Sequence, residues 1–334
     1  MSSIIDNVRQ KLESKRYADA AFMLADASQQ GDLAAIVELA SWSIAGNIIP
    51  RNLGAARSLL AQAGNGGDEA AGLLHASFLA SGTGGPADWP SAVAQLRQLE
   101  HRSARARAQL NIVDRMNLDS NGFPAGGYAA LPLCGRPAIQ LCREFLQPAE
   151  CNYLSDLGGP FLQPSVVVDP SNGRAIPHPI RLSDGAAFGV FLEDLVVAAI
   201  NRRVARLTDT QYEQGEPLQL LRYHRGGEYR PHLDALPGEP NQRIKTVILY
   251  LNQDYRGGET RFPKVDLSWA GKTGDALMFD NVDADGRADN MALHAGAPVS
   301  NGTKLIASRW IRANAFKFPP PRSIIETFNY DGRR

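Results

Sequence analysis

Residues 221–234 read Leu-Arg-Tyr-His-Arg-Gly-Gly-Glu-Tyr-Arg-Pro-His-Leu-Asp and end in a His-x-Asp motif formed by His232 and Asp234. In an extended segment, residues two apart point to the same side of the strand, so this imidazole and this carboxylate can bind one metal ion. Two imidazoles and one carboxylate on a single face suit Fe(II) and leave coordination positions open for a co-substrate and O₂. The motif therefore favours an enzyme that activates O₂, and it requires a second histidine elsewhere in the chain.

His294 is the leading candidate for that second histidine. It lies in a strand-like apolar segment, residues 290–299, which reads Asn-Met-Ala-Leu-His-Ala-Gly-Ala-Pro-Val. A lone lysine, Lys304, follows ten residues later. A lysine near the metal on the next strand can act as a point charge for the distal carboxylate of a small diacid whose other end chelates the iron. The spacing therefore predicts a site for a metal and a diacid together.

From about residue 141 to residue 316 the chain resembles the catalytic domain of prolyl 4-hydroxylases, in the Fe(II)/2-oxoglutarate-dependent dioxygenase superfamily. One His-x-Asp motif alone would be weak support, but the matching segments follow one another in the order of the family. They are residues 181–183 (RLS), 216–223 (EPLQLLRY), 226–229 (GGEY), 232–234 (HLD), 243–252 (RIKTVILYLN), 257–263 (GGETRFP), 274–279 (GDALMF), His294 and 302–304 (GTK).

The resemblance implies a double-stranded β-helix, in which two antiparallel sheets face each other as in jelly rolls and cupins. The local sequence agrees with this fold. Residues 246–251 form a β-branched, apolar run with the length of a buried strand, and residues 276–279 form a second run after a Lys-Thr-Gly turn. The polar segment 280–290 that follows is expected to lie at the mouth of the site.

The resemblance also implies which residues hold the iron and the co-substrate. The iron ligands would be His232, Asp234 and His294, and Lys304 would pair with the C5 carboxylate of 2-oxoglutarate. Other positions match residues that contact the co-substrate or the peptide in similar enzymes, namely Tyr223, Thr260 and Trp310 for 2-oxoglutarate and Arg243 for the peptide.

The reaction implied by the resemblance uses Fe(II), 2-oxoglutarate and O₂, with L-ascorbate as reductant. Oxidative decarboxylation of 2-oxoglutarate gives succinate and CO₂, and a C–H bond of the substrate becomes hydroxylated. The iron supplies the difficult chemistry, and the protein positions the reactants. The product implied for this chain is hydroxyproline within a peptide or protein.

Each of these residues also has a structural interpretation. A histidine on a strand more often has a structural or surface role than a metal, but the agreement of Asp234, His294 and Lys304 in one pattern reverses that expectation. Arg243 is equally compatible with a surface cation, and Tyr229 is expected in the core or the wall, as is Tyr250. The glycine pairs of this region suit turns rather than a phosphate-binding loop, because neither precedes a helix with Lys-Ser/Thr.

The first hundred or so residues repeat at an interval of 36 residues. The aligned positions are Ala20 with Ala56 and Ala92, Leu24 with Leu60 and Leu96, Gly31 with Gly67, Ala34 with Ala70 and Ala106, and Gly46 with Gly82. Such a period predicts stacked helical pairs, in which small residues allow close approach and each unit is buried only by its neighbours. The pattern resembles Sel1-like repeats of the tetratricopeptide-type superfamily, of which about two and a half units fit.

The repeats predict an N-terminal α-solenoid ahead of the double-stranded β-helix. The expected boundaries are 1–116 for the repeats, 117–132 for a Gly/Pro/Asn-rich linker, 133–318 for the catalytic domain and 319–334 for a C-terminal tail. A short solenoid offers a concave surface that recruits a protein partner or substrate. Capping the catalytic domain or self-association is an equally good explanation, since no charge stripe marks a groove.

The 334 residues contain 35 basic and 35 acidic side chains and are 44% hydrophobic. This balance removes the electrostatic argument for a nucleic-acid or anionic-membrane partner. The first residues contain no apolar core of a secretory signal, and no run has the length of a membrane span. The odd set of three cysteines lacks CxxC spacing. We therefore expect a cytoplasmic protein of two domains with reduced cysteines.

Two other functional classes remain open from the sequence. A sensor or adaptor would bind iron or 2-oxoglutarate without turnover and recruit partners through the repeats, although retention of all three ligands and Lys304 argues against it. An oxygenase could also act on free proline, another side chain or a small metabolite. Halogenation is disfavoured, because Asp234 occupies the position that a halide needs. Residues 161–179 and 282–290 are the segments where the substrate loops of similar enzymes differ.

Overall fold

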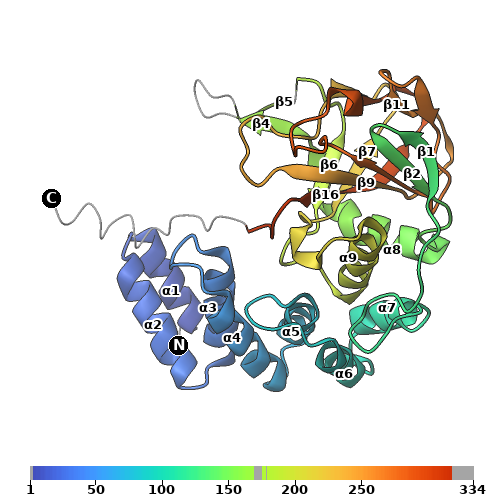
Figure 1. The fold of residues 1–334 in the computed structure, drawn as a ribbon. Coiled ribbons are helices and arrows are strands. Elements are labelled where there is room, and N and C mark those ends of the chain that lie inside the picture. Colours follow the sequence, from blue (N-terminus) through green and yellow to red (C-terminus); the bar gives the residue numbers. More distant parts are fainter. Residues whose placement is uncertain (1–2, 169–174, 178, 318–334) are drawn as a thin grey trace. The chain divides into compact units, whose positions relative to one another are not determined.

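The computed structural model describes residues 3–168, 175–177 and 179–317, with the side chains of 167, 168 and 175–177 left out (Figure 1). The chain separates into two compact units, of which the first contains Met1–Arg115 and the second contains Met116–Phe316. Each unit is described by itself. The predicted tail, 319–334, and part of the predicted variable segment 161–179 lie outside the described residues.

The first unit consists of α-helices that follow the repeat found in the sequence. After α1 (Ile4–Glu13) they form pairs, in which α2, α4 and α6 come first and α3, α5 and α7 come second. Their bounds are α2 Tyr17–Gln29, α3 Leu33–Ala45, α4 Leu53–Asn65, α5 Glu69–Ser81, α6 Trp89–Leu99 and α7 Ala104–Val113. The described part thus contains three pairs rather than two and a half, because α6 and α7 complete the last one.

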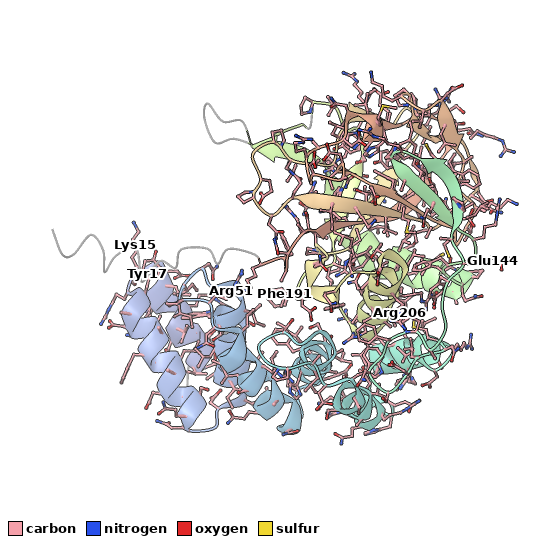
Figure 2. All side chains as sticks on the ribbon, viewed as in Figure 1. Lys15, Tyr17, Arg51, Glu144, Phe191 and Arg206 are labelled. Carbon is pink, nitrogen blue, oxygen red and sulfur yellow. The ribbon has the colours of Figure 1, made fainter. Side chains whose placement is uncertain are left out.

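The helix ends of the first unit are set by repeated capping residues. Asp32 and Asp68 accept hydrogen bonds from backbone amides in the first turns of α3 and α5. Gly46 ends α3 with a φ of 70°, which favours glycine. A Cβ at Gly46 would lie 2.8 Å from the Cβ of Arg51, which is labelled in Figure 2, so a side chain has no room there.

Leucine and alanine form the core between the helices. The positions aligned at 36 residues on the first helix of each pair are buried, namely Ala20, Ala56, Ala92, Leu24, Leu60 and Leu96. On the second helix the alignment holds for Ala34 with Ala70, which are both exposed, but it is wrong by one residue for Ala106, which is buried. The buried alanines are instead Ala35, Ala71 and Ala106, because the last pair is one residue shorter between the start of its first helix and the cap of its second.

The second unit is built on an eight-stranded sheet with the order β1-β2-β13-β9-β16-β7-β6-β3. Its strands are β1 Leu131–Gly135, β2 Ala138–Cys142, β3 Gln163–Pro164, β6 Asp184–Ala187, β7 Gln219–Tyr223, β9 Arg243–Tyr250, β13 Ala276–Asp280 and β16 Lys304–Arg312. The predicted runs 246–251 and 276–279 form most of β9 and β13, which pair antiparallel. Their apolar sequences suit strands that are covered on both faces.

A four-stranded sheet with the order β12-β11-β14-β8 faces the large sheet. Its strands are β8 Tyr229–His232, β11 Thr260–Phe262, β12 Leu267–Trp269 and β14 His294–Gly296. Two two-stranded antiparallel sheets complete the unit, formed by β10 Tyr255–Gly257 with β15 Val299–Gly302 and by β4 Val166–Val168 with β5 Ala175–Pro177. Two antiparallel sheets face to face are the predicted double-stranded β-helix, which is confirmed.

Helices cover the outer face of the large sheet, on the side away from β11 (Figure 1). They are α8 (Pro148–Gly158) and α9 (Leu195–Thr208). Gly158 lies so close to this face that a Cβ would come within 2.8 Å of Leu220 on β7. The next residue, Leu221, belongs to the apolar cluster between the sheets. Successive side chains of β7 therefore point in turn to a layer packed on the helices and to an inner layer between the sheets.

The inner layer contains aromatic and aliphatic side chains of both sheets. Its buried members are Ile139, Leu221, Tyr223, Ile248, Tyr250, Tyr255, Phe262, Leu277, Phe279, Val299 and Ile306. All three cysteines are free. Among the described residues, no helix has the length and apolar character needed to cross a membrane.

Candidate metal and co-substrate site

Strand pairing in the small sheet brings the two predicted metal-binding histidines together. His232 ends β8 and His294 begins β14, and the two residues are direct partners in the antiparallel register. The sequence predicts Asp234 on the same extended segment as His232. Asp234 instead lies in a bend just after β8. The bend turns its carboxylate back between the sheets. One donor atom from each of the three residues lies within 4.8 Å of the others.

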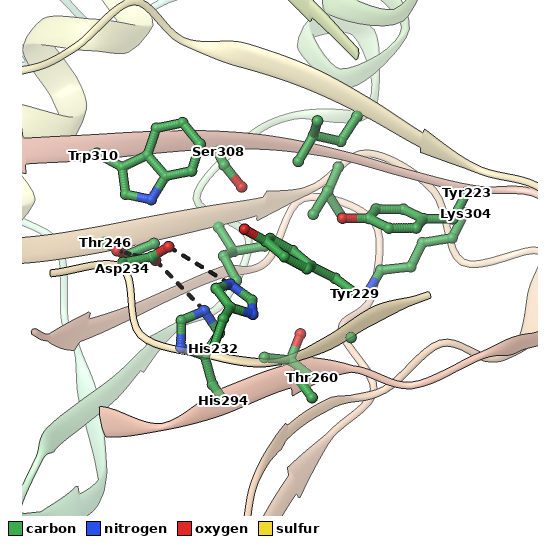
Figure 3. A pocket seen from close by; sticks show the side chains of 15 residues that line it. Tyr223, Tyr229, His232, Asp234, Thr246, Thr260, His294, Lys304, Ser308 and Trp310 are labelled. Atoms are coloured by element: carbon green, nitrogen blue, oxygen red, sulfur yellow. Dashed lines mark hydrogen bonds and ion pairs between the residues drawn. The ribbon is translucent and has the colours of Figure 1, made fainter. Parts of the chain in front are cut away.

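Both imidazoles point toward the carboxylate of Asp234 (Figure 3), and a backbone carbonyl holds each ring from the other side. The Nδ1 atom of His232 lies 2.8 Å from the carbonyl oxygen of Arg230, and that of His294 lies 3.0 Å from the carbonyl oxygen of Ala292. A proton on each Nδ1 satisfies these contacts and leaves Nε2 with its lone pair. The Nε2 atoms lie 3.6 Å and 3.5 Å from the carboxylate oxygens of Asp234.

The protonation states of the cluster suit a cation. Burial and the neighbouring His294 lower the pKa of His232 to about 4, so its imidazole is neutral at neutral pH. Burial alone would raise the pKa of Asp234, but the two imidazoles and a hydrogen bond from Thr246 lower it below the ordinary value. The neutral imidazole of His232 and the carboxylate of Asp234 are therefore ready to bind a divalent metal without losing protons.

Thr246 and Asn281 support Asp234, and neither was predicted as a site residue. The hydroxyl of Thr246 donates to Oδ2 of Asp234 over 2.6 Å, and the side-chain amide of Asn281 donates to that hydroxyl over 2.9 Å. In sequence, Thr246 is the one polar residue of the apolar run 246–251 and shares a strand face with Ile248. A polar residue on the inner face of a buried strand was the signal that could have found it.

Lys304 lies on one side of the histidines, at the start of β16 and opposite Tyr223 in the register of β7. Its ammonium donates to the carbonyl oxygen of Gly258 over 2.6 Å and lies 5.7 Å and 5.6 Å from the rings of Tyr223 and Tyr250. Burial lowers the pKa of this ammonium to about 8. The predicted Thr260 is in the same part of the pocket, where its hydroxyl contacts that of Tyr250 at 2.8 Å.

Trp310 lies on the other side of the histidines (Figure 3). The guanidinium of Arg243 stacks on the Trp310 ring at 4.0 Å and forms two hydrogen bonds, of 2.6 Å and 2.8 Å, with the carboxylate of Glu216. Arg243 does not belong to the described residues that line the pocket. In the structure, Arg243 thus forms a largely buried ion pair with Glu216. Its contact with a peptide stays a prediction.

One pocket between the sheets joins these groups. Of the predicted residues it brings together His232, Asp234, His294, Lys304, Tyr223, Thr260 and Trp310. Tyr229, expected in the core or wall, lines the same pocket and stacks on the His232 ring with centroids 3.4 Å apart. Tyr250 is fully buried in the core, as expected. Side chains from both sheets therefore form one site with a cationic end, a metal-binding centre and an aromatic end.

The donor set of the cluster differs from that of a structural zinc site. Structural zinc sites use four ligands, often including thiolates, whereas the cluster offers two imidazoles and one carboxylate on one side of the pocket. The ring nitrogens are directed by backbone carbonyls, which is the usual second contact of a metal-bound histidine. The residues therefore fit a two-histidine, one-carboxylate iron site with open positions.

Comparison with known proteins agrees with this geometry. Residues 218–312 match the 2OG-Fe(II) oxygenase superfamily. Prolyl 4-hydroxylase 1 of Arabidopsis thaliana is 34% identical over 202 residues, which are 54% of this chain and 70% of the relative. Prolyl 4-hydroxylase 5 of the same plant is 32% identical over 250 residues, which are 66% of this chain and 84% of the relative.

Solved structures give similar matches. A viral collagen prolyl hydroxylase from Paramecium Bursaria Chlorella virus-1, in a 2OG complex, is 26% identical, covering 55% of this chain and 99% of that chain with a TM-score of 0.44. A Sel1 repeat protein from Oxalobacter formigenes is 20% identical, covering 29% of this chain and 40% of that chain with a TM-score of 0.27.

The two-sheet fold and the matched superfamily make this chain a 2-oxoglutarate-dependent dioxygenase. Within that class, the curated relatives that it covers to two thirds or more are prolyl 4-hydroxylases. The chain belongs to the prolyl 4-hydroxylase family.

Proposed function

We propose that this protein hydroxylates prolyl residues of a peptide or protein, with Fe(II) held by His232, Asp234 and His294. The co-substrate is 2-oxoglutarate, the co-products are succinate and CO₂, and L-ascorbate serves as reductant. When bound, the iron would activate O₂, the oxidant, for the decarboxylation of 2-oxoglutarate and the conversion of a C–H bond into C–OH. All other steps in the pocket are binding, orientation and exclusion of water by the residues of the chain.

The buried charge of Lys304 carries this proposal. Its side chain is 3% exposed, and no carboxylate forms an ion pair with it among the described residues. A buried cation without a counter-ion is unfavourable, so its retention is explained by an anionic ligand. In this proposal, one carboxylate of a short diacid pairs with Lys304 at the end of the pocket that Tyr223 lines. The other end of the diacid then points toward the histidines.

The aromatic end of the pocket suits a substrate without a free carboxylate. Of the described residues that line the pocket, Lys304 is the only cation, and 2-oxoglutarate occupies it in this proposal. Arg243 nearby is not in the lining and forms an ion pair with Glu216, a carboxylate that it shares with Arg312. Free proline would bring a second carboxylate, for which the described lining has no second lysine or arginine, whereas a prolyl residue in a chain has that group in a peptide bond.

A further donor at this end suits a peptide carbonyl. The indole N–H of Trp310 is buried and has no hydrogen-bond partner among the described residues. Buried donors are normally paired, so an unpaired one in a pocket indicates a position for an acceptor of the ligand. The resemblance implied a contact of Trp310 with 2-oxoglutarate, but Trp310 and Lys304 lie on opposite sides of the histidines. We therefore assign this donor to a backbone carbonyl beside the prolyl ring, which favours a polypeptide over a small apolar metabolite.

The helical repeats then act in recruitment of the protein substrate or of a partner. Stacked helix pairs offer an extended surface, and the buried alanines and leucines at their centres leave the outer positions free to vary. A role limited to scaffolding is the alternative. Deletion of residues 1–115 distinguishes recruitment from scaffolding.

The test is succinate formation from 2-oxoglutarate with Fe(II), ascorbate and air. The wild-type chain is assayed with a proline-rich peptide, with the same peptide carrying alanine for proline, and with none, and the His232→Ala variant is assayed in parallel. We expect turnover that the proline peptide stimulates, that the alanine peptide does not, and that the variant lacks. Mass spectrometry of the peptide should show one added oxygen.

Other results would change the proposal in defined ways. Metal-dependent turnover that no peptide stimulates would retain the oxygenase and reject the peptidyl substrate. Iron and 2-oxoglutarate binding without turnover would support the sensor or adaptor. Unchanged turnover by His232→Ala would reject the metal assignment itself.

A further inference from the structure

Thr246 is the side chain that sets the rotation of the Asp234 carboxylate. It projects from β9 into the pocket and is 1% exposed. Its hydroxyl donates to Oδ2 of Asp234 over 2.6 Å, a length typical of a hydroxyl bound to a charged oxygen. Asp234 itself lies in a bend after β8, outside the strand ladder. A side-chain bond from a central strand therefore holds a carboxylate that no strand pairing holds.

Asn281 determines the direction in which Thr246 donates. A threonine hydroxyl has one proton and can donate to only one acceptor at a time. The amide nitrogen of Asn281 donates to the Thr246 oxygen over 2.9 Å, so that oxygen already accepts a bond from this side. With the amide reversed, two oxygens would compete for the single threonine proton. The observed orientation is the one that commits this proton to Asp234.

The backbone around Asn281 keeps its amide in place. The N–H of Asn281 donates to the carbonyl of Ile244 over 2.8 Å, and its carbonyl accepts from the N–H of Asp289 over 3.0 Å. Its Oδ1 atom is buried and has no hydrogen-bond partner among the described residues. An apolar side chain would avoid this unfavourable group, so filling space does not explain the asparagine.

We infer that Thr246 and Asn281 act as a relay that positions the metal-binding carboxylate, with Asn281 acting through Thr246. This inference rests on the proposed function, because it concerns the same three metal ligands. Groups that hydrogen-bond metal ligands orient them and raise metal affinity, and their loss commonly weakens metal binding about 10- to 100-fold. Neither residue touches the reacting atoms in this assignment, so both are positioning residues.

Metal binding by the full chain tests the relay without relying on turnover. Co(II) is titrated into the metal-free protein, and its visible absorption spectrum and Kd are measured for the wild type, Thr246→Val and Thr246→Ser. Valine keeps the shape of threonine and lacks the hydroxyl. We expect the valine variant to bind Co(II) about 10- to 100-fold more weakly with an altered spectrum, and serine to restore both.

A matched control separates the relay from general loss of a buried hydroxyl. Thr208 is also buried, but its hydroxyl bonds to the carbonyls of α9. Thr208→Val should bind Co(II) like the wild type. Circular dichroism of all variants verifies that each one is folded before its Kd is compared.

The double variant tests the order of the relay. Asn281→Leu alone should weaken Co(II) binding about fivefold, the value of one neutral hydrogen bond. In the Thr246→Val background the same change should have no further effect, because the residue through which Asn281 acts is gone. Equal effects of Asn281→Leu in both backgrounds would overturn the relay.

Two further outcomes distinguish failure of the inference from failure of the proposed function. A wild-type chain that binds Co(II) and a Thr246→Val variant that binds it equally well would overturn the inference alone. A folded wild-type chain that binds neither Co(II) nor Fe(II) would overturn the metal site, and the inference with it.

Discussion

Asp234 and Lys304 are both buried charges, but the protein stabilises them in different ways. The Asp234 carboxylate has two imidazoles and a threonine hydroxyl around it. The Lys304 ammonium has a backbone carbonyl and the faces of two tyrosines. The aspartate is thus arranged for a cation, whereas the lysine is arranged for an anion. A diacid that bridges the metal and Lys304 would satisfy both.

Replacement of a metal ligand should abolish turnover. In His232→Ala, two donor groups remain, and metal affinity falls because the third coordinating atom is lost. We expect no succinate above background and weak Fe(II) binding, measured by titration of the metal-free protein. His224→Ala is the matched control, because that side chain is 60% exposed, lies outside the described pocket lining and contacts Asp184 rather than the metal-binding cluster. Comparable activity losses in both variants would contradict the assignment.

The affinity for 2-oxoglutarate should fall at alkaline pH. Lys304 is a cation below its pKa of about 8, and there it can pair with a carboxylate directly. As the pH rises through this value, Lys304 of the protein without 2-oxoglutarate loses its proton. Lys304 must then regain that proton when 2-oxoglutarate binds, which weakens binding. We expect the KM for 2-oxoglutarate to rise by up to about tenfold per pH unit above the pKa.

Lys304→Met provides the control for this pH effect. Removal of a charge-assisted hydrogen bond should raise the KM for 2-oxoglutarate about 10- to 100-fold at pH 7. The remaining KM should show no rise with pH, since the titrating group is absent. A rise of equal slope in the variant would assign the effect to another residue.

At the scale of elements, the alternation of side chains along β7, β9 and β16 divides the second unit into two layers. One face of the strands packs on α8 and α9, and the other forms the pocket and the inner cluster. Arg309 on β16 illustrates the outer face, since its guanidinium donates to the Asn201 carbonyl in α9. Ser308 and Trp310 beside it line the pocket. The helices thus support the strands that carry the site.

A buried ion pair between α8 and α9 should contribute strongly to stability. Arg203 forms two bonds of 2.7 Å with Glu150, and the side chains are 7% and 5% exposed. Glu150→Ala leaves the arginine buried without its partner, and we expect a loss of about 3–5 kcal/mol in the free energy of unfolding. Urea unfolding followed by circular dichroism measures this loss.

An exposed ion pair offers the comparison. Arg97 and Asp114 are 2.5 Å apart, with side chains 45% and 44% exposed. Asp114→Ala should cost less than about 1 kcal/mol, because water solvates the remaining charge. Similar losses for the Asp114 and Glu150 variants would show that burial is not what makes the α8–α9 pair important.

At the scale of the whole molecule, the two units have separate cores. The first unit buries an alanine and leucine layer within helix pairs, and the second buries its aromatic cluster between sheets. All of the described residues that line the pocket belong to the second unit. The chemistry and the proposed recruitment are therefore assigned to different parts of the chain.

Deletion of residues 1–115 should separate these roles. We expect the truncated protein to hydroxylate a short proline-rich peptide with unchanged kcat and KM. Its KM for a protein substrate should rise at least about tenfold, because a second binding surface raises the effective concentration of a tethered substrate. Unchanged kinetics on the protein substrate would instead reduce the repeats to a scaffold. Circular dichroism of the truncated protein establishes that it is folded.

Much of the fold could be predicted from the sequence because its signals are local. The apolar run 246–251 predicts β9, and the period of 36 residues predicts the helix pairs. The candidate metal ligands could also be predicted, because the chemistry of iron restricts the residue types and because His232 and Asp234 lie close in sequence. The one-residue error at Ala106 arose because a fixed period does not register that α6 is shorter than α2 and α4.

What the sequence by itself determined is the paired helices of the repeats, the strands at 246–251 and 276–279, and the set of residues that could hold a metal and a diacid, since periodicity and residue chemistry are properties of short segments. Only the tertiary structure decided the partners. Arg243 pairs with Glu216, and Asp234 is held by Thr246 and, through it, by Asn281. These contacts join strands and loops far apart in the chain, and they depend on sheet register and on the bend after β8, which no local pattern specifies.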